Sequence, residues 1–204
     1  FSKYLNIDAG SSINAQASNG SGGFTETSGH YATQLLGTFR VGQGGTWLID
    51  PLDYTVDAVS AASIVNGLNS GNVTINASTG SATGATVTNS ATAGAGSITI
   101  ASAITNNSTA NTLTLNGGGA INVNAAISLT SGSLIMTAGT YSGSGALSAK
   151  TLNIAATGAG GTLAGAITLG AGGGTIAAAS GQTLTASGII SGANALTVGS
   201  AGNT

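Results

Sequence analysis

Three aspartates, Asp50, Asp53 and Asp57, form the densest acidic group in the 204-residue chain. On a strand, Asp53 and Asp57 would point to one face, because successive side chains alternate between the two faces. Such a group could bind calcium or supply the paired acids of a glycosidase. Asp50 precedes Pro51, however, and aspartates at turns commonly accept hydrogen bonds from nearby backbone amides. We therefore interpret the three carboxylates as structural.

A second candidate site is His30 with Glu26, which lies four residues earlier. His30 could act as a general base, and Glu26 could orient it. No serine stands out as a partnered nucleophile, so we interpret His30 as a solvent-facing turn residue. The cations Lys3, Arg40 and Lys150 are too few and too scattered for the cationic cleft of a polysaccharide-cleaving enzyme. We expect no enzymatic activity, no cofactor, and no catalytic, cofactor-binding or metal-binding residue.

Two parts of the chain must position these side chains, and their compositions differ. Residues 1–57 hold seven of the eight formal charges and the only Trp, Pro and His. Lys150 is the only charged residue in residues 58–204. An ordinary domain is about one quarter charged, so Ser, Thr and Asn must solvate the second part. We predict an irregular β-solenoid segment over 1–57 and regular low-charge coils over 58–204. The net charge of −2 argues against nucleic-acid binding.

Short aliphatic–polar–aliphatic triplets recur along residues 58–204. Their period of two places alternate side chains inside and outside a strand. Equivalent apolar positions recur every 20 or 21 residues, a spacing that indicates a solenoid. The intervals run from Leu113 to Leu134, Leu115 to Met136, Ile100 to Ile121, Leu134 to Ile154 and Leu169 to Ile190.

The predicted fold is all-β: a right-handed parallel β-helix with about 21 residues per coil. We expect no helix, because no helical apolar spacing survives the intervening glycines. A meander of β-hairpins is the competing architecture, but it would need Asn-Gly turns inside the array. Disorder is disfavoured, because 41% of the residues are hydrophobic and regularly placed.

Two motifs in the first part are more specific than the repeats. Residues 22–29 read GGFTETSG and residues 45–56 read GTWLIDPLDYTV. Together they resemble paired motifs of large exoproteins of the filamentous-haemagglutinin type, the passengers of bacterial two-partner secretion. The segments LNSGNVTI at 68–75 and INVNAAI at 121–127 are also similar to sequences of that family. The resemblance covers about residues 5–139.

The resemblance implies an adhesin shaft, exported unfolded by an outer-membrane transporter and located outside a Gram-negative bacterium or on its outer surface. A chain without cysteine is compatible with such export. It also implies one continuous fragment of a longer protein, whose full length would contact a host or neighbouring cell-surface receptor or glycan. We expect a structural role that supports adhesion.

Three alternatives remain open. The chain could form extracellular filaments by end-to-end self-association. It could be a carbohydrate-active β-helix. It could also bind ice through outward threonines, although asparagines interrupt a clean row; these threonines are Thr74, Thr99, Thr114, Thr168, Thr185 and Thr197.

Large aromatic side chains are rare and cluster in the first part. We predict that Trp47, with Leu48 and Ile49, plugs the core close to Phe39 and Tyr54. Five asparagines stand in Asn-x-Ser/Thr sequons, a number that the composition alone would produce; they are Asn19, Asn72, Asn76, Asn106 and Asn107.

Overall fold

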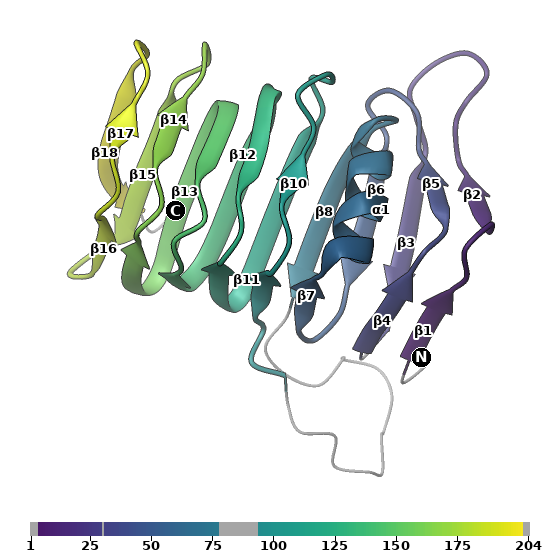
Figure 1. Ribbon diagram of the computed structural model, residues 1–204, viewed down its shortest axis with the longest axis horizontal. Coiled ribbons are helices and arrows are strands. Elements are labelled where there is room, and N and C mark those ends of the chain that lie inside the picture. Colours follow the sequence, from purple (N-terminus) through teal and green to yellow (C-terminus); the bar gives the residue numbers. More distant parts are fainter. Residues whose placement is uncertain (1–3, 30, 78–93, 202–204) are drawn as a thin grey trace.

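The computed structural model describes residues 4–29, 31–77 and 94–201, which wind into a parallel β-solenoid of about 8 turns. Each turn takes about 22 residues, one more than predicted. Every strand pairing in these ranges is parallel, which confirms the predicted solenoid and contradicts the hairpin meander. Figure 1 shows the coils stacked along the long axis of the molecule.

Each coil contributes in turn to three faces. The first face is the longest and is hydrogen-bonded without a break from β3 to β18. Three long strands bend around corners and so contribute to more than one face. The first-face strands are β3 (Phe24–Ser28), β6 (Thr46–Asp50), β8 (Asn72–Ala77), β11 (Thr112–Val123), β12 (Ile127–Ser142), β13 (Leu147–Leu163), β15 (Gly174–Ala179) and β18 (Leu196–Ala201).

The other two faces are built from shorter elements. The second comprises the ends of β11, β12 and β13 with β1 (Tyr4–Ile7), β4 (Tyr31–Leu35), β7 (Tyr54–Val56), β9 (Ile98–Ile100) and β16 (Thr183–Ala186). The third comprises the starts of β12 and β13 with β2 (Ser12–Asn14), β5 (Thr38–Arg40), α1 (Ala58–Leu68), β10 (Ile104–Thr105), β14 (Ile167–Leu169) and β17 (Ile190–Ser191).

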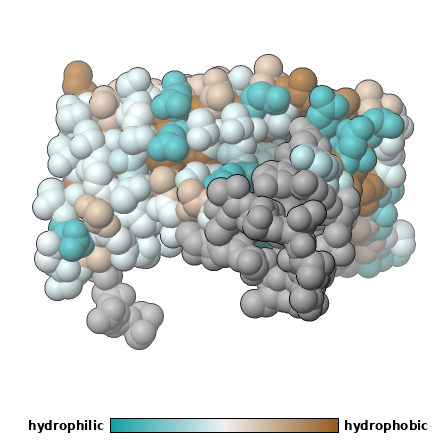
Figure 2. Space-filling view, turned by 90° about the horizontal axis from the view of Figure 1, so that it is seen from below, coloured by the Kyte–Doolittle hydropathy of each residue, from teal (hydrophilic) through white to brown (hydrophobic). Residues whose placement is uncertain are grey.

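Aliphatic side chains fill the interior in lines that run from coil to coil. On the first face, Val73, Leu113, Leu134 and Leu152 lie opposite one another and are fully buried. Burying an aliphatic side chain contributes about 1.5–3 kcal/mol, so each coil stabilises its neighbours. Seen from below, the described surface is mostly pale, with strongly hydrophilic residues in small groups, as the low charge content predicts (Figure 2).

The predicted register is only partly correct. Leu113 lies opposite Leu134 and Leu115 opposite Met136, as expected. The other three intervals are wrong by two residues, because corners differ in length between coils; the observed partners are Ile98 with Ile121, Leu134 with Leu152, and Ile167 with Ile190. An error of two keeps each side chain on its predicted side of the strand, so the inward positions remained correct.

Glycine is required where the chain turns into the third face. Gly145, Gly165 and Gly188 occupy equivalent corners in successive coils. A Cβ atom on Gly165 would lie 2.0 Å from the carbonyl oxygen of Gly145, and one on Gly188 would lie 2.1 Å from that of Gly165. Neighbouring coils can therefore approach this closely at the corner only because the corner residues are glycines, which have no side chain.

One coil departs from the predicted regularity, because α1 takes the third-face position between β7 and β8. The prediction of no helix was wrong, and the regular coils do not begin at residue 58. Ala61, Ile64 and Leu68 are buried at helical spacing, and Gly67 stands near the end of α1 rather than in its middle. No helix among the described residues is long and apolar enough to cross a membrane.

Candidate functional site

The two motifs of the first part lie directly on each other. In the β3–β6 register, Thr25 lies opposite Trp47 and Thr27 opposite Ile49. The Trp47 Nε1 donates a hydrogen bond to Thr27 Oγ1 (3.0 Å), and that hydroxyl donates to the carbonyl oxygen of Leu48 (3.2 Å). The motif residues that point inward thus form one structural unit across two coils.

Trp47 is the centre of the predicted core plug. It is fully buried and stacks on Phe39, with ring centroids 3.8 Å apart and an angle of 9° between the ring planes. Ile49 and Tyr54 are also buried. Leu48 is not part of the plug, because its side chain is on the outward side of β6 and is half-buried.

All three aspartates serve as hydrogen-bond acceptors within the fold. Asp50 accepts from Asn76 Nδ2 (3.3 Å) on the next coil, and partial burial raises its pKa against the lowering effect of this hydrogen bond. Asp53 accepts from the backbone amides of Ala95 (3.2 Å) and Ser97 (2.7 Å). The predicted face is correct, because Asp53 and Asp57 are exposed on either side of buried Tyr54. These contacts agree with the structural interpretation.

Asp57 is the N-cap of α1, because its Oδ1 accepts a hydrogen bond from the backbone amide of Ser60 (2.8 Å). Replacing Asp57 with alanine should cost about 1 kcal/mol of folding free energy, and Asp57→Asn should cost less because asparagine also caps helices. The hydrogen bond from Ser60 lowers the pKa of Asp57 below 3.8. An acid with a lowered folded-state pKa stabilises the fold above its unfolded pKa and loses that effect as the pH falls through the folded pKa.

The pH dependence of this cap can be measured by comparing the thermal unfolding of the wild type with that of Asp57→Asn from neutral pH to below 3.8. The advantage of the wild type should shrink as the pH falls. A constant difference across the range would show that the charge of Asp57 contributes nothing.

The remaining predicted chemical residues do not form a cluster. His30 and Lys3 lie outside the described residues. Glu26 is exposed on β3, and Arg40 and Lys150 are exposed on strands of different coils, β5 and β13. Within the described ranges, no three histidine, cysteine, aspartate or glutamate side chains are grouped so that they could hold a metal ion.

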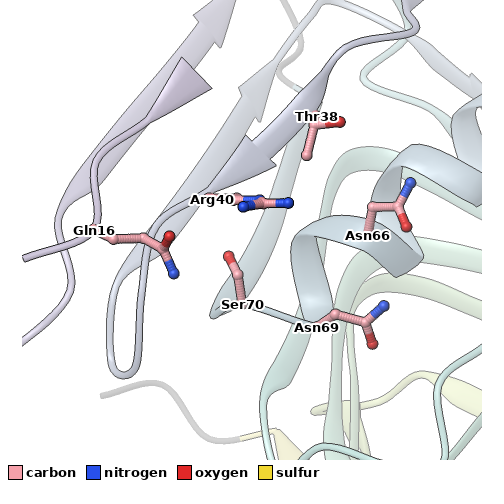
Figure 3. Close-up of a pocket in the computed structure, with 6 residues that line it drawn as sticks. All are labelled: Gln16, Thr38, Arg40, Asn66, Asn69 and Ser70. Atoms are coloured by element: carbon pink, nitrogen blue, oxygen red, sulfur yellow. The ribbon is translucent and has the colours of Figure 1, made fainter. Parts of the chain in front are cut away.

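The helix α1 borders a polar groove of about 500 Å³. Figure 3 shows Arg40 of β5 extending across this groove towards Asn66 of α1, with Gln16 and Ser70 nearby. Ser70 is already engaged, because its Oγ accepts a hydrogen bond from the backbone amide of Val41 (2.9 Å). The full lining is Gln16, Thr38, Arg40, Asn66, Asn69 and Ser70.

The chemistry of this groove is hydrogen bonding. Its amide side chains offer both donors and acceptors, and Arg40 adds a planar set of donors. None of the six lining residues is a carboxylate, so the groove lacks the paired acids of a glycosidase. The lining therefore provides hydrogen-bond donors and acceptors and one positive charge.

A hydrogen-bond network centred on the buried Asn106, which the sequence did not indicate, fixes the end of α1. Asn106 is only 4% exposed, and its Nδ2 donates to Asn69 Oδ1 (3.0 Å) and Val65 O (3.5 Å). Its Oδ1 accepts from the backbone amide (3.2 Å) and the hydroxyl (3.0 Å) of Thr109. Thr109 Oγ1 and Asn111 Nδ2 also lie within hydrogen-bonding distance of the Leu68 carbonyl oxygen, at 2.9 and 2.7 Å. The sequon asparagine Asn106 is therefore a structural residue.

The outward threonines do not form one array. Thr74, Thr114 and Thr197 share a line on the first face, but Ile135 and Asn153 interrupt it between Thr114 and Thr197. The other three lie elsewhere: Thr99 and Thr185 on the second face and Thr168 on the third. A single flat threonine surface is thus not present among these six residues.

Comparison with known proteins gives no match: no protein-family model, no curated protein and no solved structure corresponds to this chain.

Proposed function

We propose that the chain is a shaft segment of a secreted bacterial exoprotein of the filamentous-haemagglutinin type, with a mechanical rather than a catalytic role. The resemblance of the two motifs at 22–29 and 45–56 supports the family. Their direct stacking in β3 and β6 supports a structural reason for their pairing, since the inward residues of one motif pack on those of the other.

One observation carries the mechanical role: the first face is hydrogen-bonded in parallel register from β3 to β18. Strands in a sheet lie about 4.8 Å apart, so the turns extend the molecule by that distance each. The ladder satisfies the backbone amides of successive coils, and the aliphatic lines exclude water. A shaft built this way would resist proteases, because little backbone is free to enter a protease site.

The proposed location is the outer surface of a Gram-negative bacterium, reached through an outer-membrane transporter. The absence of cysteine is compatible with this route, because no disulfide could form before transport. The proposed partner is a host or neighbouring cell-surface receptor or glycan, bound by the full-length protein. Within this segment, the polar groove around Arg40 offers hydrogen-bonding groups for such a glycan.

Immunogold electron microscopy of the producing bacterium, with antibodies raised against the 204-residue chain, tests the proposal. We expect label outside the outer membrane, along thin fibres and at a constant distance from the cell. Label confined to the cell interior would contradict it. In the same cells, Arg40→Ala should reduce attachment to glycan-coated surfaces without altering the label if the groove contributes to adhesion, whereas Lys150→Ala should leave attachment unchanged.

A further inference from the structure

The third face carries a repeated pattern that the proposed function does not use. Each coil from β10 to β17 presents a small or aliphatic side chain and, two residues later, a hydroxyl. Figure 1 shows these strands on the same side of the solenoid as α1. The first line consists of the residues directly before these strand positions, which backbone hydrogen bonds align from coil to coil: Ala103, Ala126, Ala146, Ala166 and Ile189. The second line consists of Thr105, Ser128, Ser148, Thr168 and Ser191.

Both lines face solvent and carry no charge. All five residues of the first line, called the alanine line below although it ends in Ile189, are exposed. The residues of the second line, called the hydroxyl line, are exposed or half-buried. The only charged side chain among the coils that bear the two lines is Lys150, two residues beyond Ser148 and close to the corner where the β12–β13 register shifts. The face is therefore regular, neutral and unhindered by long side chains along its centre.

The two ends of the alanine line differ in shape. At one end Ile189 is 78% exposed, the most exposed large hydrophobic residue of the described chain. At the other end Ala103 borders a groove of about 530 Å³ between α1 and β10. Ala58, Ala61, Ala62, Val65 and Asn66 form the helical wall of this groove, and Ser102 and Thr105 line it beside Ala103. An apolar projection and a mainly apolar groove therefore stand at opposite ends of one line.

We propose that two copies of this chain pair side by side through their third faces, in antiparallel orientation about a two-fold axis at Ala146. A two-fold axis along the strand direction reverses the order of the coils and keeps each line opposite itself. Ala146 then meets Ala146, Ala126 meets Ala166, and Ile189 meets Ala103. The exposed isoleucine of each copy enters the groove beside α1 of the other.

The geometry favours a second copy as the occupant for two reasons. An isologous interface must be complementary to itself, and the line provides both the projection and the groove that this requires. The repeat along the line is the strand spacing, about 4.8 Å, and a second copy has the same repeat by construction. Small side chains on both copies let the two faces approach closely.

The pairing is expected to be weak. Five coils at about 4.8 Å and three residues at about 3.3 Å give a footprint of roughly 24 by 10 Å, which lies below the size of a stable interface. Lys150 would also approach the same residue of the partner copy near the axis, where like charges repel. This lateral pairing differs from end-to-end association, because it uses a face of the solenoid rather than its end strands. It does not depend on the proposed function.

Cross-linking tests the arrangement cleanly, because the chain has no cysteine. Ala146→Cys, treated with a short bismaleimide at high protein concentration, should give at least tenfold more covalent dimer than Thr114→Cys on the first face. Mixing Ala103→Cys with Ile189→Cys should give heterodimers, whereas Ala103→Cys alone should give few. Dimers from Ala103→Cys alone would indicate a parallel pair and overturn the proposal.

Sedimentation equilibrium of the uncross-linked chain provides the second measurement. Ile189→Ser should weaken dimerisation about tenfold or more, since two aliphatic side chains, one from each copy, are no longer buried. It should not affect folding because Ile189 is exposed. Lys150→Gln should strengthen dimerisation by removing the repulsion. A chain that stays monomeric at millimolar concentration, or an Ile189→Ser variant that dimerises as the wild type does, would contradict the pairing.

Discussion

Trp47→Ala is expected to lower the free energy of unfolding by about 3–5 kcal/mol, the range for removing a buried large aromatic side chain. The substitution removes the stack on Phe39 and the hydrogen bond to Thr27, and it leaves a cavity between two coils. Because coils of a solenoid contact mainly their neighbours, the first coils should unfold at lower urea concentration than the rest. Circular dichroism should therefore show an earlier first transition.

Phe24→Ala is the matched control for Trp47→Ala. Phe24 lies on the adjacent strand β3 but is 61% exposed, and substitutions at such positions usually change stability by less than about 0.5 kcal/mol. Trp47→Phe should fall between the two, because it keeps an aromatic ring and loses the Nε1 hydrogen bond. If Phe24→Ala and Trp47→Ala destabilise equally, the motif tryptophan is not the core plug described above.

Asn106→Leu should have the second-largest effect, a loss of about 1–3 kcal/mol. Leucine fills a similar volume but cannot make the hydrogen bonds of Asn106 to Asn69 Oδ1 and to the amide of Thr109. Each such hydrogen bond contributes about 0.5–1.5 kcal/mol, and the exposed Asn69 can pair with water instead. Urea unfolding followed by circular dichroism measures the loss.

Asn106→Asp separates hydrogen bonding from packing at this position. Aspartate keeps the acceptor for Thr109, but when ionised it cannot donate to Asn69 and places a charge in a buried site. Its pKa in the folded state should be raised, so the variant should regain stability as the pH falls through that pKa, when the protonated acid can donate again. The exposed Asn153→Asp on β13 is the control and should show little change. If Asn106→Asp is as stable as Asn153→Asp at neutral pH, then Asn106 does not stabilise the fold through the hydrogen bonds described above.

The sequence predicted the β-solenoid because its signal is periodic. Alternation identified the inward positions, such as Leu113, Leu115, Leu134 and Met136, and the interval gave nearly the correct coil length. It did not give the register throughout, because corners such as those after Leu129 and Ala138 differ between coils. A search for a fixed interval cannot detect a corner that changes length.

The helix and its network were missed for a different reason. The spacing of Ala61, Ile64 and Leu68 was readable, but Asp57 was assessed as a carboxylate for chemistry rather than as an N-cap. The role of Asn106 could not be read, because its partners Asn69 and Val65 lie 37 and 41 residues away. The paired motifs, in contrast, were identified from the sequence alone. Their contact across two coils became clear only from the β3–β6 register.

The replacement of one third-face strand by α1 has a consequence for how the molecule bends under load. On the first face, the parallel strand pairing continues past this coil through β6, β8 and β11. On the third face it is interrupted, because β5 pairs with β2 and β10 pairs with β12, and α1 lies between these two pairs. Side-chain contacts such as those of Asn106 and the Ser63 hydroxyl to the Leu35 carbonyl replace the missing backbone ladder there. Backbone pairing is also interrupted on the second face, where β1 and β4 form a separate sheet. Near this coil only the first face carries a continuous backbone ladder, so we expect a lateral force to bend the rod there, with the first face changing length least.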